Sequence, residues 1–212
     1  MPGEKDLYLD ILDDNQQQVF FRLATALKET DFYLAGGTAL ALQIGHRPSI
    51  DFDWFITALG EPEMLLRRLN VCEISFTVQS LATETVYLDI DTVQVSFMGY
   101  DYPLLQSPSV CRYGAKLAHI DDIACMKLSA LGSRGSRKDF VDLHYMINRF
   151  RSLKEYLNLY QRKYENRDMG HILRSLIYFE DAEAEPDILT VQPFDWQGMK
   201  HDFEKWVRLL IQ

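Results

Sequence analysis

Residues 36–55, which read GGTALALQIGHRPSIDFDWF, restrict the fold of this chain more than any other stretch. Two glycines follow a short apolar run, and the apolar residues after them have the spacing of a helix that ends at Gly45. Asp51 and Asp53 then stand in a second apolar run, DFDWFI, which has the composition of a buried strand. The stretch therefore predicts a strand, a glycine turn, a helix and an acid-bearing strand in immediate succession.

The paired acids are the candidate metal ligands. Residues i and i+2 of a strand point to the same face, so the carboxylates of Asp51 and Asp53 project together while Phe52 and Trp54 turn to the opposite face. Two carboxylates roughly 7 Å apart at an effective dielectric constant near 20 repel by about 2 kcal/mol, and a divalent cation removes that repulsion. Mg²⁺, or Mn²⁺ in its place, accepts a few carboxylate oxygens together with water and phosphate oxygens. The alternative is an edge strand on which both acids simply face water.

Gly36 and Gly37 form the candidate phosphate-binding turn. They leave a strand and enter a helix whose first N–H groups, including that of Thr38, can bind phosphate oxygens with help from the helix dipole. Glycines also serve ordinary tight turns, so the motif gains its meaning from the acids that follow it. Arg47 either reaches the phosphates or offsets the negative charge of the aspartates, and Ser49 shares the strand face of the acids, where it can contact the nucleotide.

The patterns along the chain predict an α+β protein, with a small mixed β-sheet that carries N-terminal helices, followed by a C-terminal helical bundle. Strands are expected over residues 32–35, 51–56, 73–79, 84–90 and 93–100, with a tight hairpin at Asp91 and Thr92, and helices over residues 14–28, 38–45, 61–69, 121–132, 136–150, 152–165, 169–179 and 196–211. We expect a sheet core over residues 1–110 and a helical domain, packed on it, over residues 111–212.

The composition limits the class of protein. With 212 residues, of which 47% are hydrophobic, the chain can bury a sizeable core. The N-terminal segment is acidic and has no signal pattern, and no run approaches the roughly 18 apolar residues of a membrane span, so we expect a cytoplasmic protein with no membrane partner. The net charge of −9 opposes a broad polyanion-binding surface, although Arg134, Arg137 and Lys138 form a local basic cluster. Three cysteines without a Cys-x-x-Cys spacing argue against disulfides and a zinc site.

The order strand, GGT, helix and D-h-D strand, with h an apolar residue, resembles the nucleotidyltransferase superfamily of DNA polymerase beta. The fuller strings AGGTALALQIGHRPSIDFDWF, VQVSFMGYDYPLL and DIACMKLSALGSRGSRKDFVDL, between Phe32 and Leu143, are similar to the AbiEii/AbiGii toxin family of that superfamily. The resemblance implies that the sheet is a nucleotidyltransferase core and that the reaction is Mg²⁺-dependent transfer of a nucleotidyl group from an NTP to an acceptor. In toxin members the acceptor is a tRNA 3′ end, and a separately encoded antitoxin restrains the enzyme.

The resemblance also implies roles for individual residues. Asp51 and Asp53 match the catalytic metal-binding pair, and the glycine turn with Thr38 matches the phosphate loop. In the string DIACMKLSALGSRGSRKDFVDL, Lys127 matches a charged catalytic position of the family. Lys138 and Asp139 match charged positions that bind the nucleotide.

Lys127 can also be judged from its own surroundings. Ile123, Lys127 and Leu131 follow one another at four-residue spacing through an apolar stripe, so the amine points to the interior. Burying an unpaired ammonium costs several kcal/mol, so we expect Lys127 to meet an anion, either Asp51 or Asp53 or the triphosphate. The alternative is a lysine that extends from the edge of the stripe into water.

Asp139 has a structural alternative to a role in the site. Ser136, three residues before it, resembles the first residue of a capping box that starts a helix. Asp142 lies at i+3 on the same helix face, so the two acids can instead pair with Arg134 or Lys127.

One position departs from the superfamily pattern. Many members carry a third carboxylate on a later strand, where it acts as a base or shares a second metal. Here that strand reads VQVSFM, and Ser96 stands where the acid is expected. Asp89 is a candidate substitute because across the hairpin it faces Gln94, on the side of Ser96. Two other hypotheses therefore stay open beside the enzyme: a non-catalytic nucleotide-binding or regulatory module, and an interaction domain that binds a partner such as an antitoxin.

Overall fold

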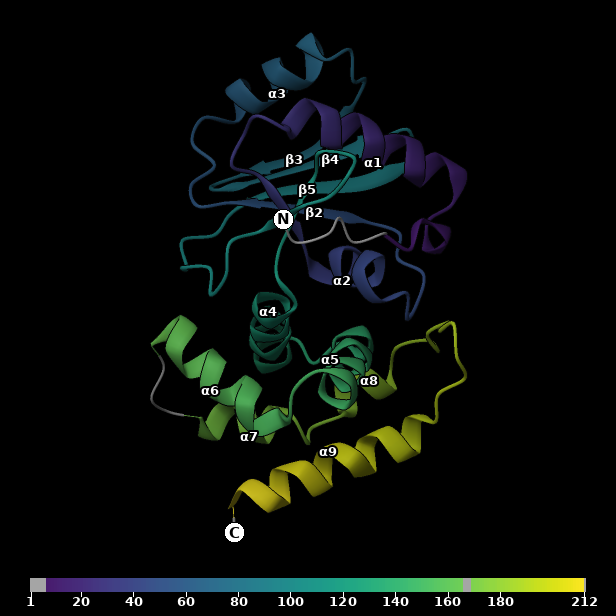
Figure 1. Ribbon diagram of the computed structural model, residues 1–212, viewed down its shortest axis with the longest axis vertical. Coiled ribbons are helices and arrows are strands. Elements are labelled where there is room, and N and C mark those ends of the chain that lie inside the picture. The colour runs from purple at the N-terminus through teal and green to yellow at the C-terminus, as the bar shows by residue number, and fades with distance from the viewer. Residues whose placement is uncertain (1–6, 166–168, 212) are drawn as a thin grey trace. The chain divides into compact units, whose positions relative to one another are not determined.

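The computed structural model describes residues 7–165 and 169–211 (Figure 1). Residues 1–6, part of the acidic segment without a signal pattern, lie outside this range. The chain forms two compact units, which we call the sheet unit, residues 1–102 and 107–119, and the helical unit, residues 103–106 and 120–212. The chain therefore stays with the sheet beyond residue 110, where the sequence predicted the boundary, because residues 116–117 still pair with the first strand.

The sheet unit is built on one seven-stranded mixed sheet in the order β3-β4-β5-β2-β1-β7-β6. Its strands are β1 (Tyr33–Ala35), β2 (Phe52–Ile56), β3 (Thr77–Ala82), β4 (Thr85–Ile90), β5 (Val93–Gly99), β6 (Ser109–Val110) and β7 (Lys116–Leu117). β2 pairs with β1 antiparallel and with β5 parallel. The acid-bearing strand is thus central, and the alternative that placed it at an edge is wrong.

The helices of the sheet unit are η1 (Leu9–Ile11), α1 (Asp14–Leu27), α2 (Gly36–Ile44) and α3 (Pro62–Val71). α1 and α3 lie on one side of the sheet and α2 on the other (Figure 1). Asp13 caps α1, because its carboxylate accepts the N–H of Gln16 at 2.8 Å. Phe20 of α1 stacks on Phe52 with ring centroids 6.0 Å apart, so Phe52 faces α1 and Asp53 faces the opposite side.

Two predicted elements begin at other residues than expected. The glycines were expected to precede α2, yet the helix begins at Gly36 itself; its end at Gly45, where φ is 63°, is confirmed. The strand predicted from residue 73 begins at Thr77. Glu73 has a φ of 56°, and the N–H of Ile74 bonds to a carbonyl of α3 at 3.0 Å. These two residues therefore close the C-terminus of α3 and are not available to the strand.

The hairpin between β4 and β5 turns at Asp91 and Thr92, as predicted. Their φ angles of 51° and 67° are those of a two-residue hairpin turn in which both central residues are left-handed. Arg22 of α1 forms a salt bridge with Asp91 at 2.5 Å, and Asn15 donates a hydrogen bond to the Asp91 carbonyl at 2.5 Å. The tip of the hairpin is therefore held against the first helix.

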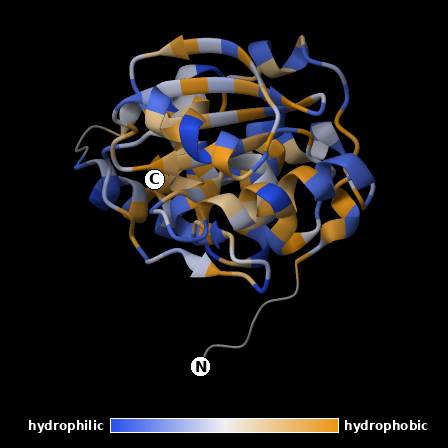
Figure 2. Ribbon diagram, turned by 90° about the horizontal axis from the view of Figure 1, so that it is seen from above, coloured by the Kyte–Doolittle hydropathy of each residue, from blue (hydrophilic) through white to orange (hydrophobic). Residues whose placement is uncertain are grey.

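The helical unit contains α4 (Ile120–Ser133), α5 (Arg137–Arg149), α6 (Leu153–Tyr164), α7 (Gly170–Ser175), α8 (Glu180–Glu183) and α9 (Trp196–Ile211). Most helices carry hydrophobic and hydrophilic residues in alternation along the ribbon, as amphipathic helices do (Figure 2). α7 is shorter than predicted, because the N–H groups of Ile177 and Tyr178 bond three residues back, at 3.2 Å each, and form a turn. α8 was not predicted.

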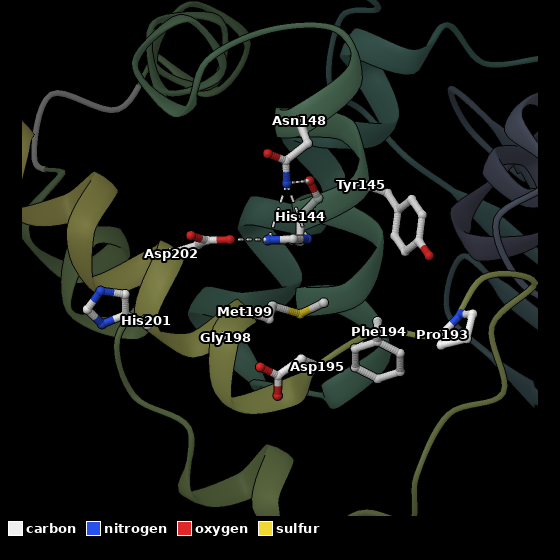
Figure 3. Close-up of a pocket in the computed structure, with 10 residues that line it drawn as sticks. All are labelled: His144, Tyr145, Asn148, Pro193, Phe194, Asp195, Gly198, Met199, His201 and Asp202. Carbon is white, nitrogen blue, oxygen red and sulfur yellow. Dashed lines mark hydrogen bonds and ion pairs between the residues drawn. The ribbon is translucent and has the colours of Figure 1, made fainter.

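Aromatic side chains join α5 to the later helices. Phe140 of α5 lies 5.4 Å from Phe203 of α9 and 5.1 Å from Phe179, measured between ring centroids. One turn further along α5, His144 bonds to the carboxylate of Asp202 in α9 at 2.9 Å (Figure 3). This packing explains why the C-terminal helix follows its predicted bounds, since its apolar stripe is buried against α5.

A buried ion pair holds residues 103–106 in the helical unit. The ammonium of Lys163 lies 2.7 Å from the carboxylate of Asp122, and both side chains are fully buried. Lys163 also donates to the carbonyl of Pro103 at 2.8 Å, and Asp122 accepts the N–H groups of Leu105 at 2.9 Å and Gln106 at 3.2 Å. The two charges are therefore satisfied by each other and by the backbone of the connecting segment.

We expect Lys163→Met to lower the free energy of unfolding by about 3–5 kcal/mol, because it leaves the carboxylate of Asp122 buried without its cation. Urea denaturation followed by circular dichroism measures this. Lys154→Met on the exposed face of the same helix is the control and should change stability by less than about 0.5 kcal/mol. Equal effects of the two substitutions would contradict the role given to the pair.

Candidate active site

The acid pair lies where β2 begins in the middle of the sheet. Asp51 immediately precedes the strand and Asp53 is its second residue, and both are partly exposed. The flanking Phe52 and Trp54 are fully buried on the opposite face, which confirms the predicted alternation. The two acids are therefore partly exposed at the beginning of a strand that is otherwise part of the core.

Gly36 brings the start of α2 directly against Asp53. Its φ is +69°, and a Cβ added there would stand 2.7 Å from Oδ2 of Asp53, closer than real side chains approach. Only glycine fits this backbone conformation next to the carboxylate without a shift. An α-helix leaves its first N–H groups without partners inside the helix, so the N-terminus of α2 and a carboxylate of β2 face the same small region.

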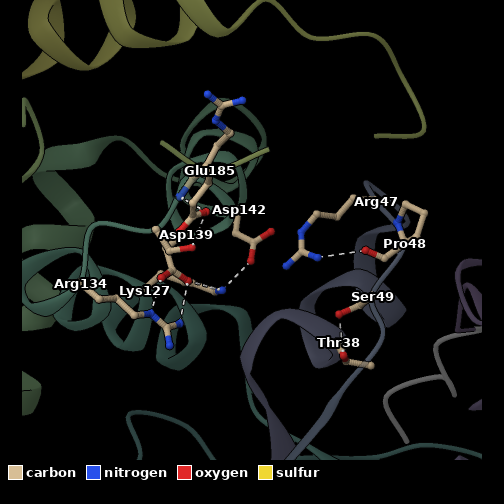
Figure 4. A network of polar contacts seen from close by, with 11 residues as sticks. Thr38, Arg47, Pro48, Ser49, Lys127, Arg134, Asp139, Asp142 and Glu185 are labelled. Atoms are coloured by element: carbon tan, nitrogen blue, oxygen red, sulfur yellow. Dashed lines mark hydrogen bonds and ion pairs between the residues drawn. The ribbon is translucent and has the colours of Figure 1, made fainter. Parts of the chain in front are cut away.

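Thr38 of α2 forms hydrogen bonds to the loop that connects α2 to β2. It is buried, and its hydroxyl lies 2.7 Å from the hydroxyl of Ser49 (Figure 4). The same hydroxyl also bonds to the carbonyl oxygen of Asp51. Arg47 is buried as well and donates from Nη1 to the carbonyl of Pro48 at 3.0 Å. These contacts give Thr38, Ser49 and Arg47 a structural role in shaping the loop, and their contact with a nucleotide stays a prediction.

Ser96 lies beside Asp53, which sequence reasoning did not foresee. The parallel register pairs Asp53 with Ser96, and the serine hydroxyl donates to Oδ1 of Asp53 at 2.5 Å. Asp89 faces Gln94 across the hairpin, as predicted, but its carboxylate accepts hydrogen bonds from that side chain at 2.8 Å and from the N–H of Thr92 at 2.9 Å. Asp89 therefore stabilises the turn, while Ser96 orients one metal-ligand candidate.

The chemistry of this region suits a hard divalent cation. Within residues 7–165 and 169–211, no group of three or more His, Cys, Asp and Glu side chains lies close enough together to hold a metal ion. Asp51 and Asp53 offer carboxylate oxygens only, which Mg²⁺ and Mn²⁺ accept, and leave the other coordination positions to water and phosphate. The residues present therefore fit an ion that is shared with a phosphorylated substrate.

Lys127 forms a buried ionic cluster inside the helical unit. Its ammonium lies 2.7 Å from Oδ1 of Asp139 and 2.6 Å from Oδ2 of Asp142, both of which are fully buried (Figure 4). Arg134 bonds from Nε to Oδ2 of Asp139 at 3.0 Å. The acids of α5 thus pair with Lys127 and Arg134, which confirms the alternative given for Asp139 and Asp142. Contact of Lys127 with Asp51, Asp53 or the triphosphate stays a prediction. The alternative of a lysine that extends into water is wrong.

The neighbouring cations control the charge of Asp139. Burial alone would raise its pKa, but the ammonium of Lys127 and the guanidinium of Arg134 outweigh burial and hold the pKa of Asp139 below its usual value. The capping-box interpretation is wrong in detail. Ser136 precedes α5, yet its hydroxyl donates to Glu185 at 3.0 Å, and that carboxylate also accepts the N–H of Arg137 at 2.9 Å. An acid from a distant loop therefore caps the helix.

The predicted basic cluster is mostly paired within the helical unit. Arg134 contacts Asp139, and Arg137 is buried with Nη1 2.5 Å from Asp187 and its guanidinium over the ring of Trp196. Lys138 lies in the first turn of α5 and is partly buried. Contact of Lys127, Lys138 or Asp139 with a nucleotide stays a prediction.

Comparison with known proteins identifies the family. The model of the family described as "Nucleotidyl transferase AbiEii toxin, Type IV TA system" matches residues 18–103 and 112–208. The chain belongs to the AbiEii nucleotidyltransferase toxin family. An uncharacterized protein of Aquifex aeolicus is 38% identical to this AbiEii-family protein over 188 residues, which cover 86% of this chain and 89% of the relative.

Solved structures share the fold. JHP933 from Helicobacter pylori superposes with a TM-score of 0.61 at 21% identity and covers 94% of this chain and 93% of its own. The nucleotidyltransferase toxin MenT4 from Mycobacterium tuberculosis superposes with a TM-score of 0.59 at 15% identity, over 93% of this chain and 85% of its own. The AbiEii-family protein is thus a nucleotidyltransferase of the toxin–antitoxin class. Among its described helices, none has the length and apolar character to cross a membrane.

The lowered pKa of Asp139 predicts a pH-dependent contribution to stability. The charged carboxylate stabilises the fold above the unfolded-state pKa of about 3.9, and this contribution is lost as the pH falls through the lower pKa of the folded state. We expect Asp139→Asn to reduce stability by about 2 kcal/mol at pH 7 and by progressively less below pH 4. Urea denaturation from pH 7 to pH 3 tests this, with the exposed Glu204→Gln as control. A difference from the parent protein that stays constant with pH would contradict the assignment.

We expect Gly36→Ala to reduce nucleotidyl transfer, because its methyl group displaces Asp53. Gly60→Ala is the matched control, since Gly60 has a φ of +67° with nothing within 4 Å of an added Cβ. Both substitutions should cost about 1 kcal/mol of backbone strain. Only Gly36→Ala should slow pyrophosphate release, by roughly 100-fold if the carboxylate moves by about 1 Å. Equal rates for the two variants would show that the close approach has no catalytic importance.

Proposed function

We propose that this AbiEii-family protein catalyses Mg²⁺-dependent transfer of a nucleotidyl group from an NTP to the 3′ end of an RNA, with tRNA as the acceptor, in the cytoplasm. The observation that carries the proposal is the approach of the N-terminus of α2 to Asp53, where a Cβ on Gly36 would lie 2.7 Å from the carboxylate. A helix N-terminus binds phosphate and a carboxylate binds a cation, so together they suit a metal-bound triphosphate.

Asp51 and Asp53 would hold the divalent ion, Mg²⁺ or Mn²⁺. When bound, this ion would supply positive charge to the phosphate oxygens and so stabilise the charge that develops during phosphoryl transfer. Ser96 donates to Oδ1 of Asp53, and Oδ2 is the atom nearest to a Cβ built on Gly36, at the N-terminus of α2. The protein thereby fixes the direction of one carboxylate before substrate binds.

The chain's own groups would bind and orient the triphosphate. The N–H groups of Gly36, Gly37 and Thr38, at the start of α2, are assigned to phosphate oxygens, with Arg47 and Ser49 as further nucleotide contacts. In the reaction, the oxygen of an acceptor hydroxyl forms a bond to the α-phosphorus. The bond between that phosphorus and the oxygen that bridges the α- and β-phosphates breaks. Pyrophosphate leaves, and the hydroxyl proton passes to water. No oxidant or reductant is needed.

The helical unit contributes a separate set of proposed contacts. Lys138, in the first turn of α5, remains its proposed nucleotide contact. Lys127 and Asp139 are bonded to each other at 2.7 Å and are buried, which favours a role in the shape of the helical unit over a direct role in transfer. Membership of a toxin–antitoxin family supports a further proposal, that a cognate antitoxin binds and restrains the enzyme.

The test is transfer of label from each of the four NTPs to total RNA in the presence of Mg²⁺, followed by mass spectrometry of RNA and protein. We expect labelled RNA 3′ ends with the parent protein and a loss of at least 1,000-fold with the double substitution Asp51→Asn and Asp53→Asn, since removal of a single charge-stabilising donor already costs roughly 10²–10³-fold. Asp101→Asn, which removes one exposed acid from the same unit, is the control and should retain full transfer.

Each component of the proposal has its own contrary result. Equal labelling by the parent and the double variant would exclude the acid pair. Labelled protein with unlabelled RNA would keep the transferase and exclude the RNA acceptor. A rise in melting temperature with NTP and Mg²⁺, but no pyrophosphate release with any acceptor, would favour the non-catalytic nucleotide-binding module.

A further inference from the structure

The helical unit contains a pocket whose lining includes none of the residues proposed for nucleotidyl transfer. It has a volume of about 450 Å³ and lies between α5, the start of α9 and the segment of residues 193–195 that precedes α9 (Figure 3). Pockets of about 300–1,000 Å³ are typical of small-ligand sites. All its lining residues belong to the helical unit, and the predicted nucleotide-binding residues are not among them.

Two carboxylates give the pocket its charge. Asp202 bonds through Oδ2 to Nε2 of His144 at 2.9 Å, and Asp195 accepts the N–H of Gln197 through Oδ1 at 3.0 Å. Within the part of the chain that the structure describes, the second oxygen of each of these carboxylates has no hydrogen-bond partner. A Cβ on Gly198 would lie 2.7 Å from Oδ2 of Asp195, so the glycine leaves space for that oxygen. The pocket therefore keeps acceptor capacity for a ligand.

The acids of the lining disfavour anions. Among the described residues that form it there is no lysine or arginine, and its basic groups are the imidazoles of His144, which bonds to Asp202, and of His201. The phosphates of an NTP would therefore meet two carboxylates and are less suited to this pocket than a cation. A ligand that brings positive charge would instead be attracted by both acids.

The remaining walls suit a flat or slender cation. Phe194, Tyr145 and Met199 supply aromatic and apolar surface beside the acids (Figure 3). Aromatic faces attract cations through the ring quadrupole, and a guanidinium can stack on a ring while it donates two parallel hydrogen bonds to a carboxylate. The acids therefore favour a positively charged group, and the aromatic and apolar walls favour the apolar stem that carries it.

We propose that this pocket binds an organic cation, a guanidinium or ammonium group on a short apolar stem. The group belongs either to a free amine or to an arginine or lysine side chain of a bound protein, which share this chemistry. The proposal does not depend on nucleotidyl transfer, since the residues that carry it lie outside the predicted transferase site.

Calorimetric titration of the full chain with argininamide and with citrullinamide tests the proposal. The two probes have almost the same shape, but citrullinamide has a neutral urea in place of the guanidinium. We expect argininamide to bind at least tenfold more tightly. The double substitution Asp195→Asn and Asp202→Asn should abolish this preference, because asparagine still caps the helix and still bonds to His144 but lacks the charge. Glu204→Gln, an exposed acid of α9 outside the pocket, is the matched control and should keep the preference.

Further probes distinguish a protein side chain from a free amine as the natural ligand, and other results would show that no cation binds. Tighter binding of a blocked Gly-Arg-Gly peptide than of agmatine supports a protein side chain as the natural ligand, and the reverse order supports a free amine. Equal affinity for argininamide and citrullinamide, or absence of binding by both probes, would overturn the proposal. Label transfer to RNA, measured in parallel, should be unchanged in the double variant, so failure here is distinguishable from failure of the proposed transferase.

Discussion

The parallel, in-register pairing of β2 with β5 sets the geometry on which the rest of the sheet unit depends, and it places the hydroxyl of Ser96 2.5 Å from the carboxylate of Asp53. It also puts β2 inside the sheet. A parallel neighbour cannot follow through a tight turn, so the chain must leave and return, and the intervening segment supplies α3 and the β3–β4 hairpin. The parallel pairing of β2 with β5 thus explains much of the order in which the strands are arranged.

The helical unit buries charged side chains in ion pairs. Lys127 with Asp139 and Asp142, and Lys163 with Asp122, form compact clusters in which each carboxylate contacts a cation. Buried ion pairs add little net stability compared with apolar packing, because desolvation opposes the attraction. Their geometry is nevertheless demanding, so an alternative packing of these helices would leave an unpaired charge in the core. We infer that the clusters select one arrangement of α4, α5 and α6.

Local patterns were sufficient to predict most of the fold. The long helices α4, α5, α6 and α9 and the hairpin at Asp91 and Thr92 follow from periodicity and turn chemistry, which act over a few residues. The two-residue strands β6 and β7 were missed because they carry no pattern of their own and exist only through pairing with distant residues. The same holds for charges. The buried amine of Lys127 could be predicted from its stripe, whereas the choice among its predicted anionic partners depends on how α5 packs against α4. The glycine turn and the acid pair were found from local spacing and composition, but the hydroxyl beside Asp53 needed the register of β5.

The path of the chain through residues 103–119 prevents the two units from being separated by a single cut in the sequence. Because residues 103–106 are held by Asp122 and Lys163 and residues 107–119 rejoin the sheet, the backbone is interleaved between the units. No single cut in the gene separates two complete modules. A fragment that stops at residue 102 lacks β7 and exposes the edge of β1, and one that starts at residue 120 lacks the backbone groups that solvate Asp122. Recombination between relatives should therefore preserve this region as a block.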